Sequence, residues 1–212
     1  MAAAFRSITS FKSQLTGGGA RPNLFEVELA FPTASNLNFM SNASTPTSET
    51  ASLTTSGVSD KVPFLVKAAA LPASNITPIS VPFRGRELKV AGERTFDSWT
   101  VTVLNDADFK IRTVMEEWMN AISRLTNGSG EVNPTDYTAD AAVYQLDRNG
   151  NTLRKYNFLG LFPTNVSEIA LSMDTTDTIE EFTVEFQVLY WTASSITSGT
   201  GTSATTVAPA IN

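Results

Sequence analysis

The spacing of apolar residues changes its period between residues 94 and 125. Trp99, Val101 and Val103 alternate with polar residues, as in a strand that packs one face on a core. Beyond them, apolar residues recur at intervals of three or four, which is typical of one face of an amphipathic helix. These helical positions are Ile111, Val114, Met115, Trp118, Ile122 and Leu125. The pattern predicts a strand followed by one long α-helix.

We expect this helix to span about residues 106–126, because residues suited to helix ends flank it. Asn105 and Asp106 can accept hydrogen bonds from the free N–H groups of a first helical turn. Asn127-Gly128 can adopt the left-handed conformation that ends many helices.

Period-two alternation recurs along most of the remaining chain and predicts about seven to nine strands. The main stretches are 25–31, 63–70, 79–83, 99–103, 140–146, 152–159, 169–173 and 182–190. Asn149-Gly150 predicts a two-residue hairpin turn with Leu146 opposite Leu153. Residues 91–93 are predicted to form a turn, and residues 162–165 a loop.

These elements predict a mainly β protein, an antiparallel β-sandwich or partly open barrel with one long helix against it. Such a sheet leaves edge strands unpaired in a single copy. We divide the chain into an N-terminal arm (1–20), a β-domain (21–192) and a flexible C-terminal tail (193–212). Within the β-domain, the Ser/Thr-rich stretch 33–61 is interpreted as a loop insertion. The arm has apolar residues at helical spacing and is either a short amphipathic helix or a frayed end.

The chain has 212 residues but neither cysteine nor histidine. Thiolate nucleophiles, the Ser-His-Asp triad and the commonest zinc sites are therefore excluded. Glu116 and Glu117 are adjacent on the predicted helix and do not face each other, so they do not form a catalytic pair. Trp99 and Trp118 lie in apolar patterns, which favours the core over a sugar-binding platform. We expect no catalytic residue, no metal ligand and no cofactor.

The net charge of −6 comes from the C-terminal part of the chain. Residues 131–212 contain 10 Asp/Glu and 3 Lys/Arg, whereas residues 1–130 contain 11 Asp/Glu and 12 Lys/Arg. Nucleic-acid binding is disfavoured, because phosphate contacts come from Lys and Arg. No apolar run reaches the roughly 18 residues of a membrane span, so no membrane insertion is expected.

Six stretches together resemble one known family, and they cover most of residues 20–191. They read ARPNLFEVE (20–28), KAAALP (67–72), VPFRGR (81–86), VAGERTFDSWTVTVLND (90–106), GLFPTNV (160–166) and LYW (189–191). In wording and order they are similar to the tail tube proteins of contractile-tailed (myovirus) bacteriophages, which are related in fold to type VI secretion tube proteins. The stretch 33–61 and the tail after Trp191 depart from this resemblance.

The resemblance implies a structural virion protein without enzymatic activity. It implies hexameric rings that stack into a hollow tube inside a contractile sheath, assembled in the host cytoplasm. The implied partners are further copies of the chain and the sheath, baseplate and neck or terminator proteins, with phage DNA passing through the lumen without specific binding. A tube of a contractile injection or type VI secretion-like system, carrying protein effectors, is the alternative. A carbohydrate-binding β-sandwich is a more distant one.

Three sets of residues are predicted to matter for such an assembly. The arginines expected at subunit contacts are Arg84, Arg86 and Arg94. The acidic residues expected to face the lumen are Asp147, Glu181 and Glu185. An equally supported alternative is that they are ordinary solvent-exposed charges on the outer surface. The family-motif positions are Arg21, Pro22, Asn23, Phe25, Leu71, Pro72, Gly92, Arg94, Phe96, Trp99, Asn105, Asp106, Pro163, Thr164, Asn165 and Trp191.

Overall fold

The computed structural model describes residues 7–15, 19–32, 56–174 and 176–195. Most of the predicted insertion 33–61 and most of the predicted tail lie outside the described residues. The strands are β1 (Phe25–Leu29), β2 (Val66–Ala69), β3 (Ser74–Phe83), β4 (Arg86–Phe96), β5 (Trp99–Leu104), β6 (Ala139–Leu146), β7 (Thr152–Val166), β8 (Glu181–Gln187) and β9 (Tyr190–Ser195). The helices are α1 (Ile8–Gln14), α2 (Ser56–Ser59), α3 (Val62–Leu65), α4 (Lys110–Ile122) and α5 (Pro134–Tyr137).

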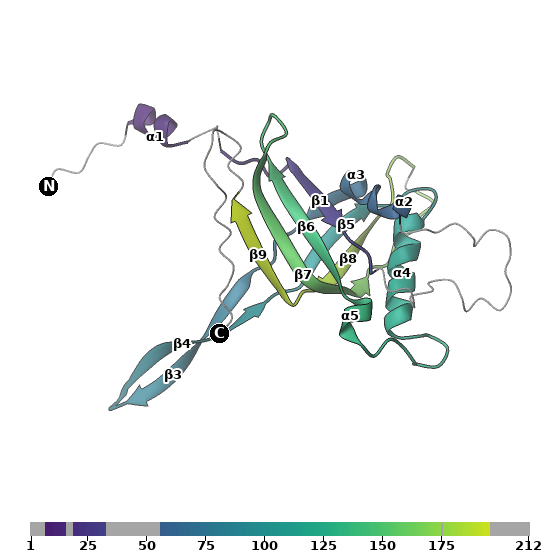
Figure 1. Cartoon of the computed structure of the whole chain (residues 1–212). Helices are drawn as coiled ribbons and strands as arrows, with labels where there is room; N and C mark the ends of the chain where they lie inside the picture. Colours follow the sequence, from purple (N-terminus) through teal and green to yellow (C-terminus); the bar gives the residue numbers. More distant parts are fainter. Residues whose placement is uncertain (1–6, 16–18, 33–55, 175, 196–212) are drawn as a thin grey trace.

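One strand, β7, joins the two halves of a seven-stranded antiparallel sheet (Figure 1). The sheet has the order β1-β6-β7-β8-β5-β2, and β9 also pairs with β7. The first part of β7 pairs with β6 and β9, and its last part pairs with β8. Gly160 lies between these parts with φ +61°, a conformation that favours glycine. The sheet folds over itself at this strand, and the expected partly open antiparallel barrel is confirmed.

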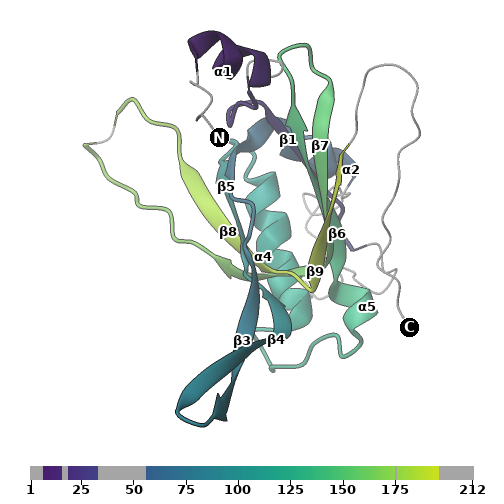
Figure 2. The same cartoon turned by 90° about the vertical axis from the view of Figure 1, so that its left-hand side faces the viewer.

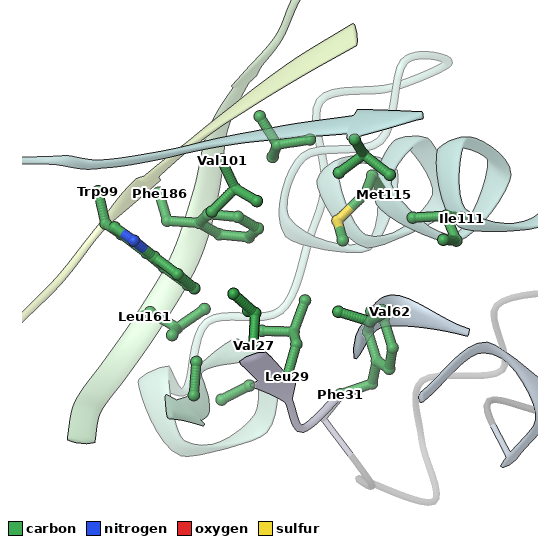
Figure 3. Packing of buried hydrophobic residues seen from close by; sticks show 14 of the residues in the cluster. Val27, Leu29, Phe31, Val62, Trp99, Val101, Ile111, Met115, Leu161 and Phe186 are labelled. Carbon is green, nitrogen blue, oxygen red and sulfur yellow. The ribbon is translucent and has the colours of Figure 1, made fainter. Parts of the chain in front are cut away.

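Helix α4 packs its apolar side against the inner faces of the folded sheet (Figure 3). Trp118 is fully buried between Phe31 and Phe186, with ring centroids 6.0 and 6.1 Å away. Across the core, the Trp99 ring of β5 stacks on Phe158 of β7 at 4.6 Å. The two tryptophans predicted to lie in the core are therefore both central to it.

The helix begins later than the sequence predicted. It starts at Lys110 rather than near residue 106, and the preceding Phe109 has a left-handed conformation with φ +53°. Asp106 does not cap the helix, because the N-cap position is Phe109, and the Asp106 carboxylate instead accepts a hydrogen bond from the Lys61 ammonium, ahead of α3. A long-range ion pair thus replaces the local cap.

The helix also ends earlier, at Ile122, and Leu125 is 93% exposed instead of extending the apolar face. The chain folds back after the helix, so that the Glu131 N–H donates to the Ala121 carbonyl at 3.1 Å. This contact satisfies a carbonyl at the helix end without a further helical turn. Gly128 does have positive φ, +66°, but it lies in the turn beyond the helix.

Pairing with distant strands changes several other predicted elements. Residues 62–65 form the short helix α3 instead of a strand. Residues 162–165, predicted as a loop, extend β7 because they pair with β8. Residues 169–173, predicted as a strand, form none, and Met173 is fully exposed because no neighbouring strand pairs with it. At the β6–β7 turn, Leu146 lies opposite Thr152 rather than Leu153, which gives a longer turn.

Strands β3 and β4 form a separate two-stranded hairpin that projects from the sheet (Figure 1). Its turn is at Arg84-Gly85, and residues 91–93 are part of β4, so the predicted turn there is wrong. Gly92 lies where the pairing register shifts, and two residues of β4 oppose one residue of β3. A Cβ atom on Gly92 would lie 2.3 Å from the Thr77 carbonyl oxygen, so only glycine fits without a backbone shift.

Replacing Phe158 with alanine should test the stacking that links the two halves of the sheet. We expect the free energy of unfolding to fall by about 3 to 5 kcal/mol, because a fully buried ring is replaced by a cavity. Denaturant unfolding of the unassembled chain measures the change. The control Phe64→Ala removes a ring that is 85% exposed and should change stability by at most about 0.5 kcal/mol. Equal losses in both variants would contradict the described core.

Gly92→Ala should distort the hairpin without unfolding the barrel, because its new Cβ meets the Thr77 carbonyl while the core is unchanged. Amide hydrogen exchange should show lost protection in β3 and β4 and retained protection in β5 to β8. Glu93→Ala, which changes the neighbouring exposed residue, is the control and should retain amide protection in the hairpin and in β5 to β8. Unchanged protection in Gly92→Ala would mean that the hairpin tolerates a side chain there.

Candidate functional site

Three strands of the sheet have a free edge. Among the described residues β1 pairs only with β6, β2 only with β5, and β9 only with β7. Unpaired N–H and C=O groups on such edges favour pairing with another chain. The open edges expected from the sequence are therefore present in this single copy.

The projecting hairpin exposes an apolar face. The cross-strand pairs Ile79–Val90 and Val81–Leu88 lie on one face, and each of these four side chains is 45 to 62% exposed. Phe83, on the same face near the tip, is 66% exposed. A two-stranded hairpin has little stability alone in water, so this apolar ribbon is suited to packing against another surface.

The three arginines predicted at subunit contacts all lie on this hairpin. Arg84 is in the turn, where its guanidinium stacks over the Phe83 ring at 5.5 Å. Arg86 pairs across the ladder with Phe83, and Arg94 pairs with Ile76 near the hairpin base. Among the described residues, none of these arginines has an ion-pair partner.

Several family-motif residues fix the base of the hairpin. Leu71 and the buried Pro72 connect β2 to β3. The Phe96 ring, at the end of β4, lies 6.2 Å edge-on from the Trp191 ring of β9. Gly92 permits the register shift already described. These residues thus set how the hairpin leaves the barrel.

The motif at the start of the β-domain forms a turn into β1, which begins at Phe25. The Leu24 N–H donates to the Arg21 carbonyl at 3.2 Å, across Pro22 and Asn23. The Gln145 side chain donates to the same carbonyl at 2.6 Å. This motif therefore holds the beginning of β1 against β6.

The motif 163–165 lies in β7, next to β8. The Thr164 hydroxyl donates to the Glu185 carbonyl at 3.0 Å, and Asn165 lies opposite Glu185 in the ladder. Pro163 lies opposite Phe186. These residues complete the pairing that sequence alone did not indicate.

Asn105 and Asp106 connect β5 to distant parts of the chain. The Asn105 side chain donates to the Glu180 carboxylate at 2.9 Å. The Lys61 ammonium bonds to Asp106 and lies 3.4 Å from Asp108, and the hydrogen bond to Asp106 is the main reason that the pKa of Lys61 is raised. The hydrogen bond from Lys110 lowers the pKa of Asp108. This cluster attaches the α2–α3 segment to the beginning of α4.

Two of the three acidic residues predicted to face the lumen share a face. Glu181 and Glu185 both point outward from β8, where Glu181 pairs with Lys67 at 2.6 Å and Glu185 accepts a hydrogen bond from Ser98 at 2.5 Å. Asp147 lies instead in the β6–β7 turn. On this outward face Glu185 lies opposite Thr100 of β5, and the neighbouring Thr183 of β8 lies opposite Thr102.

The loop between β7 and β8 is a further exposed surface, part of which was predicted to be a strand. We call residues 168–174 and 176–180 the acidic loop, because they contain four Asp/Glu and no Lys/Arg. It also exposes Leu171 (79%), Met173 (100%) and Ile179 (71%). The charge run was visible in the sequence, but alternation of the apolar residues suggested a half-buried strand.

A groove of about 1160 Å³ lies along the outward face of β1, β6 and β7 beside the α2–α3 segment. Three of its polar lining residues contact one another, since Tyr144 donates to Glu28 at 2.8 Å and Lys155 lies 4.8 Å from the centre of the Tyr144 ring. Glu26 and Glu28 on this outward face of β1 are exposed, whereas Val27 and Leu29 face the core.

The described residues offer little for catalysis. They contain no group of three or more carboxylates placed to hold a metal ion. Glu116 pairs with Arg112 at 2.7 Å along α4, as expected for a solvated helix face, and partial burial raises the pKa of Glu117. No helix in the described part of the chain is long and apolar enough to span a bilayer.

Solved structures with the same fold come from contractile injection systems. The chain superposes on a protein of the sheath/tube terminator of an extracellular contractile injection system, PVC, with a TM-score of 0.54 over 82% of this chain and 96% of that one, at 12% identity. It also superposes on a protein in the baseplate of the anti-feeding prophage, with a TM-score of 0.53 and 11% identity. The superposition covers 84% of this chain and 97% of that protein. These likenesses support the fold alone.

Sequence comparison is more specific. The chain is 33% identical to tail tube protein gp19 of Enterobacteria phage T4 over 177 residues, which cover 83% of this chain and 93% of the relative. It is 28% identical to the tail tube protein of Serratia phage KSP90 over 116 residues, covering 55% and 66%. The family model described as phage tail tube protein matches residues 20–194. The resemblance stated from the motifs is confirmed: this chain belongs to the phage tail tube protein family, whose members are structural, non-enzymatic components of the virion tail.

Proposed function

We propose that the chain assembles into six-membered rings, which stack into the hollow inner tube of a contractile phage tail. The main support is the projecting hairpin, which exposes an apolar face and carries three arginines without an ion-pair partner within the described part of one copy. The free edges of β1, β2 and β9 support the same assembly, because ring closure pairs edges between copies. Sheath, baseplate and terminator proteins would be the further partners.

The tube would be the conduit for DNA ejection into the host. We assign the outward face of β5 and β8 to the lumen, since it presents threonines and the carboxylates of Glu181 and Glu185. Lys67 of the neighbouring strand β2 forms an ion pair with Glu181. A lumen poor in free Lys and Arg forms few ion pairs with phosphates, so DNA can move along it without breaking such pairs at each step.

The tube of a contractile injection system, carrying protein effectors, is the second candidate. It is favoured by the fold shared with proteins of such systems, although at 11 to 12% identity. Each of the two reported sequence relatives belongs to a phage, which supports DNA as the cargo. The sugar-binding alternative is disfavoured, because Trp99 and Trp118 are buried and cannot form an exposed platform.

Electron microscopy of the purified chain, incubated with a baseplate to nucleate assembly, tests the proposal. The wild-type chain should form hollow rods of uniform width. Arg86→Glu and Arg94→Glu should each reduce rod formation, because they place the wrong charge at a contact, while circular dichroism shows a folded monomer. Arg124→Glu, in the turn after α4, is the matched control and should assemble. A wild-type chain that stays monomeric even with the baseplate would contradict the proposed assembly.

The lumen assignment predicts a difference between two carboxylates. Glu185→Lys should leave tubes intact but slow DNA release from virions, because the new cation binds passing phosphates. Asp147→Lys makes the same charge change in the β6–β7 turn and should release DNA at the wild-type rate. The assignment would be wrong if only Asp147→Lys slowed release, or if a tube reconstruction placed Glu185 on the outer surface.

A further inference from the structure

The hairpin and the acidic loop have complementary chemistry. The hairpin (Ser74–Phe96) contains four Lys/Arg and two Asp/Glu, whereas the acidic loop contains four Asp/Glu and no Lys/Arg. Both surfaces also expose large apolar side chains, such as Phe83 and Leu88 on the hairpin and Leu171 and Met173 on the loop. Each surface therefore offers the other an apolar contact and the opposite charge.

The charges on both surfaces are available for pairing. Glu168, Asp174 and Asp177 of the loop are exposed, and in the described part of the chain none of them has an ion-pair partner. The same holds for Arg84 and Arg86 of the hairpin, which flank Phe83. Pairing these groups would break no ion pair already present in the described structure.

The loop is attached firmly at both ends although it has no regular structure of its own. At its beginning, Ser167 donates its N–H to the Thr183 carbonyl at 2.8 Å, and Arg112 of α4 donates to the Ser167 carbonyl at 3.2 Å. At its end, Glu180 is held by Asn105, through both its backbone and its side chain. The exposed residues between these anchors project from a fixed base.

A single chain cannot bring the two surfaces together. The hairpin tip and the acidic loop, which runs between β7 and β8, project in different directions from the barrel in both views (Figures 1 and 2). A contact between them must therefore join different copies. Hairpin-to-hairpin or loop-to-loop contacts would place like charges together, which electrostatics disfavours.

We propose that the hairpin of one copy packs against the acidic loop of a neighbouring copy. Arg84 and Arg86 pair with Asp174 and Asp177, and the apolar residues beside them pack together. The contact is head-to-tail, because each copy provides one hairpin and receives another, so it propagates around a ring or along a stack. This inference rests on the proposed assembly and names the partner surface for its arginines.

A charge-exchange experiment tests this pairing. One variant, Arg84→Glu with Arg86→Glu, reverses the hairpin, and another, Asp174→Lys with Asp177→Lys, reverses the loop. Each alone should lower the yield of sedimented tube by about tenfold or more, because like charges meet at every contact. An equal mixture of the two variants should assemble, since each hairpin then finds a loop of opposite charge on the other variant. A chain carrying all four changes should also assemble alone.

Circular dichroism and hydrogen exchange on unassembled chains establish that each variant is folded. If a reversed variant does not fold, the neutral changes Arg84→Gln with Arg86→Gln and Asp174→Asn with Asp177→Asn replace it. For paired surfaces, combining both neutral sets should reduce assembly no more than either set alone.

Other results would overturn the pairing and leave the proposed function standing. One is normal tube formation by the loop-reversed variant. This outcome would count against the pairing even if that variant no longer bound the sheath. Another is failure of both the mixture and the four-change chain to recover assembly. A wild-type chain that forms no tube with a baseplate present would instead contradict the proposed function itself.

Discussion

The architecture depends on the sharing of β7 between two halves of one sheet. Gly160 makes this possible, because its positive φ redirects the strand and its N–H donates to Asp140 at 3.0 Å. A Cβ atom there would lie only 3.2 Å from the Leu189 side chain. The fold-over brings Trp99 onto Phe158 and creates the space that α4 fills. It also leaves the barrel open, which is why β1, β2 and β9 keep free edges.

The core and the projecting elements therefore have separate roles. Burial of the large side chains from both halves of the sheet and from α4 accounts for the stability of the barrel. The hairpin and the acidic loop contribute little to that core but are held by specific contacts at their bases, such as Phe96 with Trp191 and Asn105 with Glu180. Their exposed apolar groups are unfavourable in an isolated copy and become useful once a neighbour covers them.

This division also explains what the family motifs encode. Many of the motif residues have a structural place within one copy, where they form the turn before β1, the β7–β8 pairing and the base of the hairpin. Their role is to place the edges and projections that an assembly needs. The charged residues at the projections, by contrast, have unused bonding capacity in the described chain, which makes them the candidates for contacts between copies.

The sequence by itself determined the alternating strands, the amphipathic face of α4 and the burial of Trp99 and Trp118, because each depends on local periodicity against one core. Its motifs also identified the family. Tertiary structure decided whatever required a distant partner. Asp106, which was predicted to cap the helix, instead accepts a hydrogen bond from Lys61. Residues 162–165, which were predicted to form a loop, are part of a strand because they pair with β8. Residues 169–173 have the alternation of a strand but find no strand to pair with, because periodicity specifies which residues share a face and not whether a neighbour is present to pair with them.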